Sequence, residues 1–186
     1  MQLRKKAVMI VDDDVGRRKR VYDVLKITGF DIFSAASGDE ALGRLPREKP
    51  RLVVVNTTSP GTMGNDFIRR LRTYGMGQKM IVIGMTTDED GEKEKARQAG
   101  ADELLSELFS PFSLVEMVSN HLGIERIEIP KGEFEKRREV VEELAQSYRQ
   151  HKHSHKDQPP KVQLMLPGGR DLGTLLLTED AGRGRT

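Results

Sequence analysis

AVMIVDDDVGRRKRVYDVLKITGF, residues 7–30, holds a short apolar run, three consecutive acids and an amphipathic segment that ends near a glycine. The apolar run at 7–11 is typical of a strand that is buried on both faces. Residues suited to a buried helix face then recur at helical spacing from Val21 to Thr28, and Gly29 lies where a helix would end. The stretch predicts a strand followed by a helix, with the acids between them.

The same alternation of apolar runs and amphipathic segments continues to about residue 122. Further strands are expected at residues 31–34, 52–55, 80–83 and 103–105, and helices at residues 15–28, 38–45, 65–73, 89–99 and 113–122. Because each connection is long enough for a helix, the strands should be parallel with right-handed crossovers. The sequence therefore predicts an α/β fold, a (βα)5 doubly wound parallel five-stranded sheet, followed by a C-terminal helix and a tail.

The composition limits the classes of protein to which the chain can belong. Its 186 residues have room for one full domain and a smaller appendage. With 31 Lys+Arg against 29 Asp+Glu, the chain is no polycation, so nucleic acid is not favoured as a partner. Cysteine is absent, and no apolar run approaches membrane-spanning length. We expect a cytoplasmic protein without membrane insertion.

The pattern divides the chain into three parts. The strand and helix alternation fills residues 1–124, and residues 125–156 comprise a charged helix, expected at 131–151, and a polar linker that contains histidines. Residues 157–186 form a short tail, in which VQLMLPGGRDLGTLLL places a Gly-Gly turn between two apolar runs. Such a segment is typical of a hairpin or of a segment that docks on a partner.

The predicted C-terminal helix carries an apolar stripe. Its members, which lie on one side at helical spacing, are Phe134, Val141, Leu144 and Tyr148. A stripe of this kind needs a surface to cover it. These residues are therefore candidates for packing on the first domain, for pairing in a homodimer, or for binding another protein.

Most of the residues where the predicted strands end are polar. Asp12 and Asp13 follow the first strand, Asn56 ends the third, and Met85 and Thr86 end the fourth. In an open α/β sheet, ligands bind beyond the carboxyl ends of the strands, near the point where the strand order reverses. A functional site is therefore expected at this edge of the sheet.

Residues 5–122 resemble the receiver domain of two-component response regulators. The segments that carry the resemblance are AVMIVDDDVGRRKRVYDVLKITGF, RLVVVNTTSPGTMG, QAGADELL and SPFSLVEMV. The resemblance implies a flavodoxin-like receiver fold, and phosphoryl transfer from a histidine kinase to an aspartate that ends the third strand. It also implies Mg²⁺ held by that aspartate and by an acidic pair, which Asp12 and Asp13 match.

The nucleophile position holds an asparagine. The family pattern places a proline four residues and a glycine eight residues after the nucleophile, and Pro60 and Gly64 count back to Asn56. A neutral carboxamide is a poor nucleophile toward phosphorus and adds no charge for a hard cation. We therefore expect no phosphorylation at Asn56 and no required cofactor.

Two interpretations of the acidic residues stay open. Asp12, Asp13 and Thr58 are candidates for a weak Mg²⁺ site, because hard cations prefer oxygen ligands. Alternatively, the acids form a solvated turn that caps the following helix. The basic run at residues 17–20 is interpreted as a solvated face of that helix, since four consecutive residues spread around its axis.

Three further positions of the family pattern have also changed. The lysine expected after the fifth strand falls on Glu107, or on Ser110 if three residues are inserted. The hydroxyl residue expected after the fourth strand falls on Met85, or on Thr86 with a one-residue gap, and the aromatic switch residue falls on Leu104 or Glu107. Coordinated loss of these residues predicts a pseudo-receiver that works without phosphorylation.

The expected function is protein–protein interaction in bacterial two-component signalling, without enzymatic activity and with other signalling proteins as partners. Binding is expected on the predicted helices at 89–99 and 113–122, on the strand between them and on the C-terminal helix. One alternative is a response regulator phosphorylated at a non-standard residue. Another is a nucleic-acid-binding regulator that uses the C-terminal segment, although that segment contains no recognisable helix-turn-helix pattern.

Overall fold

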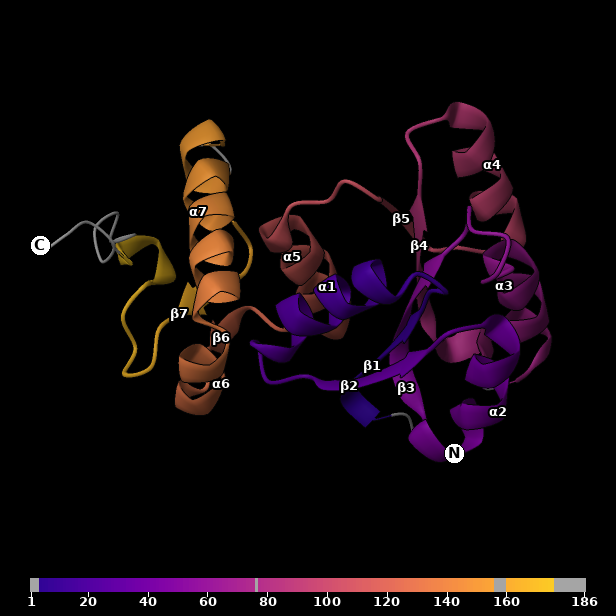
Figure 1. Ribbon diagram of the computed structural model, residues 1–186, viewed down its shortest axis with the longest axis horizontal. Helices are drawn as coiled ribbons and strands as arrows, with labels where there is room; N and C mark the ends of the chain where they lie inside the picture. The colour runs from indigo at the N-terminus through magenta and orange to yellow at the C-terminus, as the bar shows by residue number, and fades with distance from the viewer. Residues whose placement is uncertain (1–3, 76, 156–159, 176–186) are drawn as a thin grey trace, which may run out of the picture.

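A computed structural model describes residues 4–75, 77–155 and 160–175, and a five-stranded parallel sheet lies at its centre (Figure 1). The strands are β1 (Arg4–Val11), β2 (Asp31–Ala35), β3 (Pro50–Asn56), β4 (Ile81–Thr86) and β5 (Glu103–Ser106), in the order β2-β1-β3-β4-β5. The strand order reverses between β1 and β3, so a crevice is expected at the carboxyl ends of these two strands. The predicted doubly wound (βα)5 sheet is confirmed.

Helices cover both faces of this sheet. On one face lie α1 (Val15–Lys26) and α5 (Pro111–Leu122), and on the other lie α2 (Gly38–Glu48), α3 (Gly64–Thr73) and α4 (Asp90–Ala99) (Figure 1). A short 3-10 helix, η1 (Gly77–Lys79), precedes β4. Alternate residues of β1 enter separate apolar clusters, Val8 and Ile10 with α1 and α5, Met9 and Val11 with α2 and α3. Burial on both faces explains why the strand reads as an unbroken apolar run.

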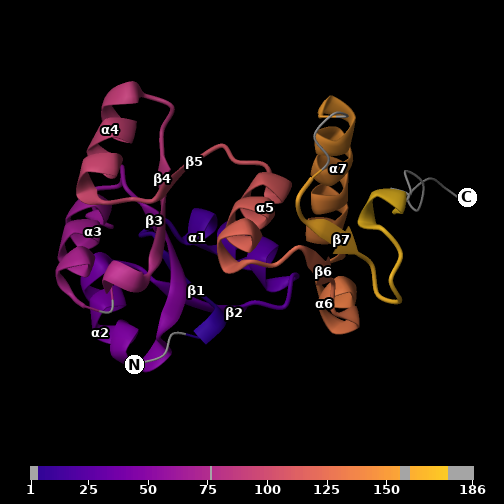
Figure 2. The ribbon, with the colours of Figure 1, turned by 180° about the vertical axis from the view of Figure 1, so that it is seen from behind.

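The chain beyond residue 124 forms a layer against α1 and α5 (Figure 2). Its elements are β6 (Arg126–Glu128), α6 (Lys131–Lys136), α7 (Arg138–Ser154), β7 (Gln163–Met165) and the 3-10 helix η2 (Leu172–Thr174). β6 and β7 pair in parallel, and α7 contacts both α5 and α1. The residues of this layer join the apolar cluster of the α1 and α5 face, so the two parts share one core.

The apolar stripe of the C-terminal helix faces inward in this arrangement. Val141, Leu144 and Tyr148 are fully buried, and the half-buried Phe134 packs against the same cluster. The Tyr148 ring lies 4.9 Å from the ring of Phe112 on α5. Of the three occupants considered for the stripe, the first domain covers it. The expectation that these residues bind a partner is therefore corrected, because their side chains are already removed from water within the chain.

The predicted boundaries of the C-terminal part also need correction. The expected single helix breaks at Arg137, whose φ of −127° and ψ of 44° separate α6 from α7. The helix α7 then runs past the expected end at His151 to Ser154, so His153 lies in the helix and not in a linker. The ring of His151 lies 4.9 Å from that of Phe112, and this contact packs the last turns of α7 on α5.

The tail forms only a minimal hairpin. Its first apolar run forms β7, which pairs with β6, and the turn at Gly168 and Gly169 leads back to an isolated antiparallel bridge between Met165 and Asp171. Both glycines have positive φ values, 86° and 83°, which other residues rarely adopt. Residues 156–159 and 176–186, which include part of the predicted linker and most of the second apolar run, lie outside the described residues. None of the described helices is both long and apolar enough to cross a membrane.

Candidate functional site

The polar cluster at the carboxyl edge, which we call the pocket and define by Asp12, Asn56 and Glu107, is built by the ends of β1 and β3 and by the segment after β5. Val11 pairs with Val55, so Asp12 and Asn56, which follow these two residues, emerge side by side, and both are fully buried. Glu107 joins them because its backbone N–H donates to the carbonyl of Thr86 at 3.0 Å. These contacts place a carboxamide between two carboxylates.

The carboxamide of Asn56 is fixed at both ends. Its oxygen accepts the backbone N–H of Thr58 at 2.8 Å and that of Ser59 at 2.9 Å. Its nitrogen faces Asp12 at 3.5 Å and Glu107 at 3.4 Å. The neutral NH₂ group is a donor, which suits a position between two acceptors. An aspartate at residue 56 would instead bring a third negative charge to this point.

A cation reaches the pocket from the first turn of α1. The guanidinium of Arg17 donates from Nε to one oxygen of Asp12 at 2.5 Å and from Nη2 to the other oxygen at 3.0 Å. Its Nη1 lies 3.8 Å from Glu107. The hydrogen bond to Asp12 raises the pKa of Arg17 above its usual value. Arg17 therefore stays charged and holds both carboxylates.

The interpretation of residues 17–20 as a uniformly solvated face is wrong for its first two members. Arg17 is 26% exposed and enters the pocket, and Arg18 donates to the backbone carbonyl of Asp12 at 2.5 Å. Lys19, in contrast, is 73% exposed. The local cause is the helix start, because Asp14 caps α1 by accepting the N–H of Arg17 at 2.6 Å. Side chains in the first turn point back toward the strand end.

Asp13 turns away from Asp12 toward the loop between β3 and α3. Its carboxylate accepts the hydroxyl of Ser59 and that of Thr62, the latter at 2.9 Å. The bond from Ser59 is the main reason that the pKa of Asp13 falls below its usual value. A Cβ on Gly61 would lie 2.2 Å from Asp13 Oδ2, so only glycine allows this approach. Asp13 serves to fix the loop.

The donor set does not fit the Mg²⁺ that the family resemblance implies. Both oxygens of Asp12 accept from Arg17, the oxygen of Asn56 accepts backbone N–H groups, and Asp13 accepts hydroxyls. The Thr58 hydroxyl donates to Glu107 at 2.5 Å. Across residues 4–75, 77–155 and 160–175, no group of three His, Cys, Asp or Glu side chains is arranged to hold a metal ion. A hard cation needs such oxygens free to coordinate it.

The structure distinguishes the alternatives left open by alignment. Glu107 faces the pocket, whereas Ser110 is exposed and caps α5 by accepting the N–H of Ser113 at 3.1 Å. The sheet register pairs Asn56 with Met85, so these two side chains lie on the same face of the sheet. Thr86, the next residue, points to the opposite face. Glu107 and Met85 thus lie on the side of the sheet edge that carries Asn56, whereas Ser110 caps a helix and Thr86 faces the other side.

Thr86 and Leu104, on β4 and β5, bear on whether a switch is present. The hydroxyl of Thr86 is buried and has no hydrogen-bond partner among the described residues. Leu104 pairs with Gly84 across the sheet and is half-buried. Leucine has neither a hydroxyl group nor an aromatic ring whose contacts could change when the contacts of the pocket change. The arrangement therefore lacks an aromatic residue where the family pattern expects one.

Sequence reasoning missed Arg17 as a member of the site. Four consecutive basic residues look alike in sequence, and periodicity alone does not identify which one turns back to the strand end. The available signal was the acidic triplet followed within one helical turn by arginine. A capping residue at Asp14 fixes the start of the helix, and hence the direction of the third helical residue.

Known proteins match the first part of this chain. The family model of the response regulator receiver domain matches residues 8–119. The phosphate regulon transcriptional regulatory protein PhoB of Pseudomonas aeruginosa is 29% identical over 59% of this chain and 48% of its own length. The alkaline phosphatase synthesis transcriptional regulatory protein PhoP of Bacillus subtilis is 30% identical over 69% and 53%. This chain thus spans about half the length of the curated relatives that it matches.

Solved structures agree with the sequence relatives. A response regulator from Chloroflexus aurantiacus is 28% identical, with a TM-score of 0.60, over 63% of this chain and 98% of that chain. Chemotaxis response regulator CheY4 of Vibrio cholerae is 23% identical, with a TM-score of 0.57, over 62% and 97%, and supports the fold alone. Together with the β2-β1-β3-β4-β5 sheet and the family match, these findings identify the chain as a member of the response regulator receiver domain family of two-component signalling.

Proposed function

We propose that this chain is a pseudo-receiver, which transmits signals by binding other proteins and not by accepting a phosphoryl group. The observation that carries the proposal is Asn56, held by its backbone contacts between Asp12 and Glu107. A carboxamide lacks the anionic oxygen that would attack phosphorus. Glu107 would also repel the oxygens of a transferred phosphoryl group, where such chemistry needs a cation.

The rim of the pocket is the surface that we propose for partner binding. Three side chains on the segments after β1, β3 and β5 are apolar and strongly exposed: Val15 by 69%, Met63 by 62% and Leu108 by 89%. Single exposed apolar residues are common, but three around one pocket favour a contact surface. Because α7 covers one side of α5, the surface expected on that helix is reduced. Another signalling protein, or a second copy of this chain, would contact the rim.

The absence of phosphorylation can be tested with acetyl phosphate and Mg²⁺, by intact-mass spectrometry of the full chain. We expect no adduct on the wild-type chain, since residue 56 is a carboxamide. The Asn56→Asp variant, which differs from wild type only by a carboxylate in place of the carboxamide, is the matched control for the assay. Stoichiometric labelling of the wild-type chain would contradict the proposal. Labelling that maps to Thr58 or Ser59 would support a receiver with a non-standard phosphoacceptor.

The rim can be tested by comparing captured proteins for three full-length baits: wild type, Leu108→Glu and Tyr74→Glu. Tyr74 is 56% exposed but lies after α3, at the other edge of the sheet, so its variant is the matched control. We expect a signalling protein to be captured by the wild type and by Tyr74→Glu, lost with Leu108→Glu, and unaffected by acetyl phosphate. Equal capture by all three baits would place the binding surface elsewhere.

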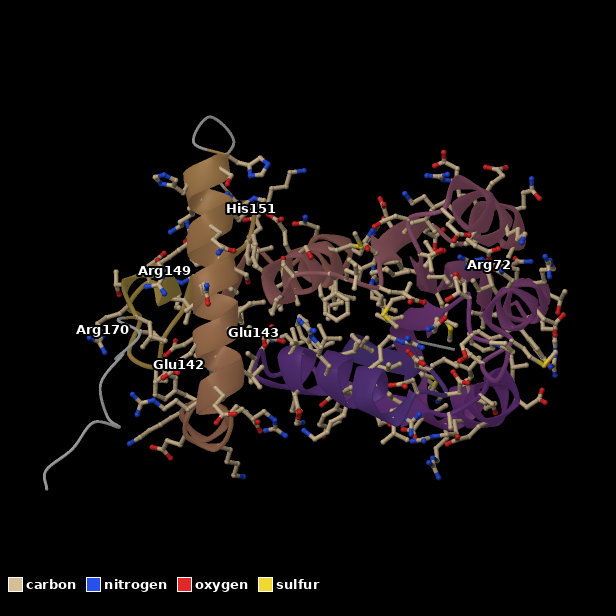
Figure 3. The ribbon with its side chains drawn as sticks, turned by 45° about the horizontal axis from the view of Figure 1, so that its top comes forward. Arg72, Glu142, Glu143, Arg149, His151 and Arg170 are labelled. Atoms are coloured by element: carbon tan, nitrogen blue, oxygen red, sulfur yellow. The ribbon has the colours of Figure 1, made fainter. Side chains whose placement is uncertain are left out.

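Nucleic-acid binding is a second candidate, because PhoB and PhoP are named as transcriptional regulatory proteins. The charged side chains of α7, of which Figure 3 labels Glu142, Glu143 and Arg149, favour the first candidate. Glu142 pairs with Arg138 at 2.9 Å, Glu143 pairs with Arg20 at 3.0 Å, and Arg149 donates to the Leu175 carbonyl at 2.6 Å. Basic side chains that are paired with carboxylates or with a backbone carbonyl do not form a positive stripe that could bind phosphates. Salt-sensitive retardation of duplex DNA by the full chain would favour the second candidate.

A further inference from the structure

The pocket concentrates negative charge in a place that water reaches poorly. Asp12 is fully buried, and Glu107 is only 22% exposed. Two carboxylates that share a site of low dielectric destabilise each other unless a cation lies between them. The protein therefore needs a counter-ion here, whether or not it ever accepts a phosphoryl group.

Arg17 has the geometry of that counter-ion. Its planar fork donates to both oxygens of Asp12, which is the arrangement that arginine and carboxylate favour, and its third nitrogen faces Glu107. The NH₂ group of Asn56 supplies further donors to the same two carboxylates. The acceptors of the pocket are thus satisfied by the chain itself.

The neighbouring basic side chains have other partners. Lys19 forms an ion pair with Asp23 within the helix, and Arg20 pairs with Glu143 of α7. Arg18 approaches the backbone of Asp12 and not its carboxylate. Arg17 is the member of the basic run whose guanidinium forms an ion pair with the Asp12 side chain, so its role can be separated from general surface charge by mutation.

We propose that Arg17 is a built-in counter-ion that takes the place of a divalent cation, and that its removal turns the pocket into a divalent-cation site formed by Asp12 and Glu107. This inference rests on the proposed function, since a receiver that exchanged a metal and a phosphoryl group would gain nothing from a permanently bound arginine. It predicts that the guanidinium and a divalent cation compete for the Asp12 carboxylate, because the two cannot bind it at the same time.

The test measures thermal unfolding of the full chain in EDTA and in about 10 mM Mg²⁺, for wild type, Arg17→Gln and Lys19→Gln. Lys19→Gln removes one positive charge from the same helix and is the matched control. In EDTA, Arg17→Gln should lower the melting temperature by on the order of 5 °C, because two carboxylates lose their counter-ion. Mg²⁺ should restore on the order of 3 °C of that loss. It should leave wild type and Lys19→Gln almost unchanged.

Two further variants keep the test decisive if Arg17→Gln unfolds. Arg17→Gln combined with Glu107→Gln removes the repulsion together with the cation, so it should melt close to wild type in EDTA and lose the response to Mg²⁺. Arg17→Lys keeps the positive charge but lacks the planar guanidinium, so its melting temperature should lie between those of wild type and Arg17→Gln. Mg²⁺ that stabilises the wild type as much as Arg17→Gln would overturn the inference, as would an Arg17→Gln variant that melts like Lys19→Gln.

Failure of this inference can be told apart from failure of the proposed function. The inference concerns metal-dependent stability, whereas the function concerns the phosphoryl adduct measured by mass with acetyl phosphate. A wild-type chain that is labelled overturns the function. A wild-type chain that stays unlabelled but gains stability with Mg²⁺ overturns the counter-ion role alone.

Discussion

Two arginines hold opposite edges of the same sheet and are about equally exposed, 26% for Arg17 and 22% for Arg72. Arg72, near the end of α3, lies far from α7 (Figure 3). Its guanidinium donates to the carbonyls of Gly77, Met80 and Gly100 and to the carboxylate of Asp102, at 2.7–3.0 Å. Arg17 bonds to carboxylates at the carboxyl edge. One arginine satisfies mostly neutral acceptors, and the other balances charge.

This difference between the partners of Arg72 and those of Arg17 indicates which of the two arginines a small cation could replace. The carbonyls around Arg72 are fixed by η1, by the start of β4 and by the turn before β5, so their directions match the five donors of a guanidinium. A metal ion would not reproduce that pattern. The carboxylates around Arg17 need positive charge more than a particular geometry. Mutations at the two edges should therefore respond differently to metal ions.

The largest effect is expected from Arg72→Gln. The change leaves several carbonyls with no donor and Asp102 without its cation, so the free energy of unfolding should fall by about 3 kcal/mol. Mg²⁺ should not restore it. Urea unfolding with and without Mg²⁺ measures both quantities, and recovery with Mg²⁺ would remove the distinction between the two edges.

Asn56→Asp should give the next largest effect. It brings a third carboxylate beside Asp12 and Glu107, so the free energy of unfolding in EDTA should fall by about 2 kcal/mol. Mg²⁺ affinity should rise at least about tenfold, since the new carboxylate at residue 56 adds anionic oxygens that Arg17 does not hold. Calorimetric titration of wild type and variant measures the affinity. Equal Mg²⁺ affinities would contradict the charge-balance account.

Signalling should recover less than metal binding in the Asn56→Asp variant. No cation replaces the lysine at Glu107, and Leu104 has no aromatic ring to couple the pocket to a surface, so a two-state element is missing. Partner affinity should be the same with and without beryllofluoride. A response to beryllofluoride in this single variant would mean that the switch is intact.

The fold was predictable from sequence because burial on both faces leaves unbroken apolar runs, as in residues 52–55 and 80–83. The loss of the nucleophile was also readable, since Pro60 and Gly64 fix the count to Asn56. Arg17 was not predictable, because its role depends on how one side chain turns at a helix start. The same limit applies to β6 and β7, three-residue strands whose pairing joins distant segments.

The acidic partners of the two arginines offer a matched pair of substitutions, Glu107→Gln and Asp102→Asn. Glutamine keeps the oxygen that accepts from Thr58 and removes excess negative charge, so stability should change by less than about 0.5 kcal/mol. Asp102→Asn weakens a charge-assisted bond to Arg72 and should cost about 1 kcal/mol. Urea unfolding of both variants gives the comparison. A larger loss for Glu107→Gln would reverse the assigned roles.

A pH-dependent effect is expected at Asp13, which lies at the carboxyl edge and is held by hydroxyl groups, with no hydrogen bond from Arg17. Its hydroxyl partners, chiefly Ser59, lower the pKa of its carboxyl in the folded chain below the usual value of 3.8. A carboxyl with a lowered folded pKa stabilises the fold fully above its unfolded pKa, and this contribution is lost as the pH falls through the folded pKa. The contribution is therefore present at neutral pH and declines as the pH falls below about 4.

Asp13→Asn should reveal that contribution as a pH-dependent difference. At pH 7 the variant should be less stable than wild type by less than about 1 kcal/mol, which is the range of one or two hydrogen bonds to a partly exposed group. The two proteins should converge as the pH falls through the lowered folded pKa, because wild-type Asp13 then becomes protonated and accepts its hydroxyl donors no better than asparagine. Urea unfolding at constant ionic strength across this pH range measures the difference. A difference for Asp13→Asn that does not change with pH would show that its carboxylate charge contributes nothing at this edge.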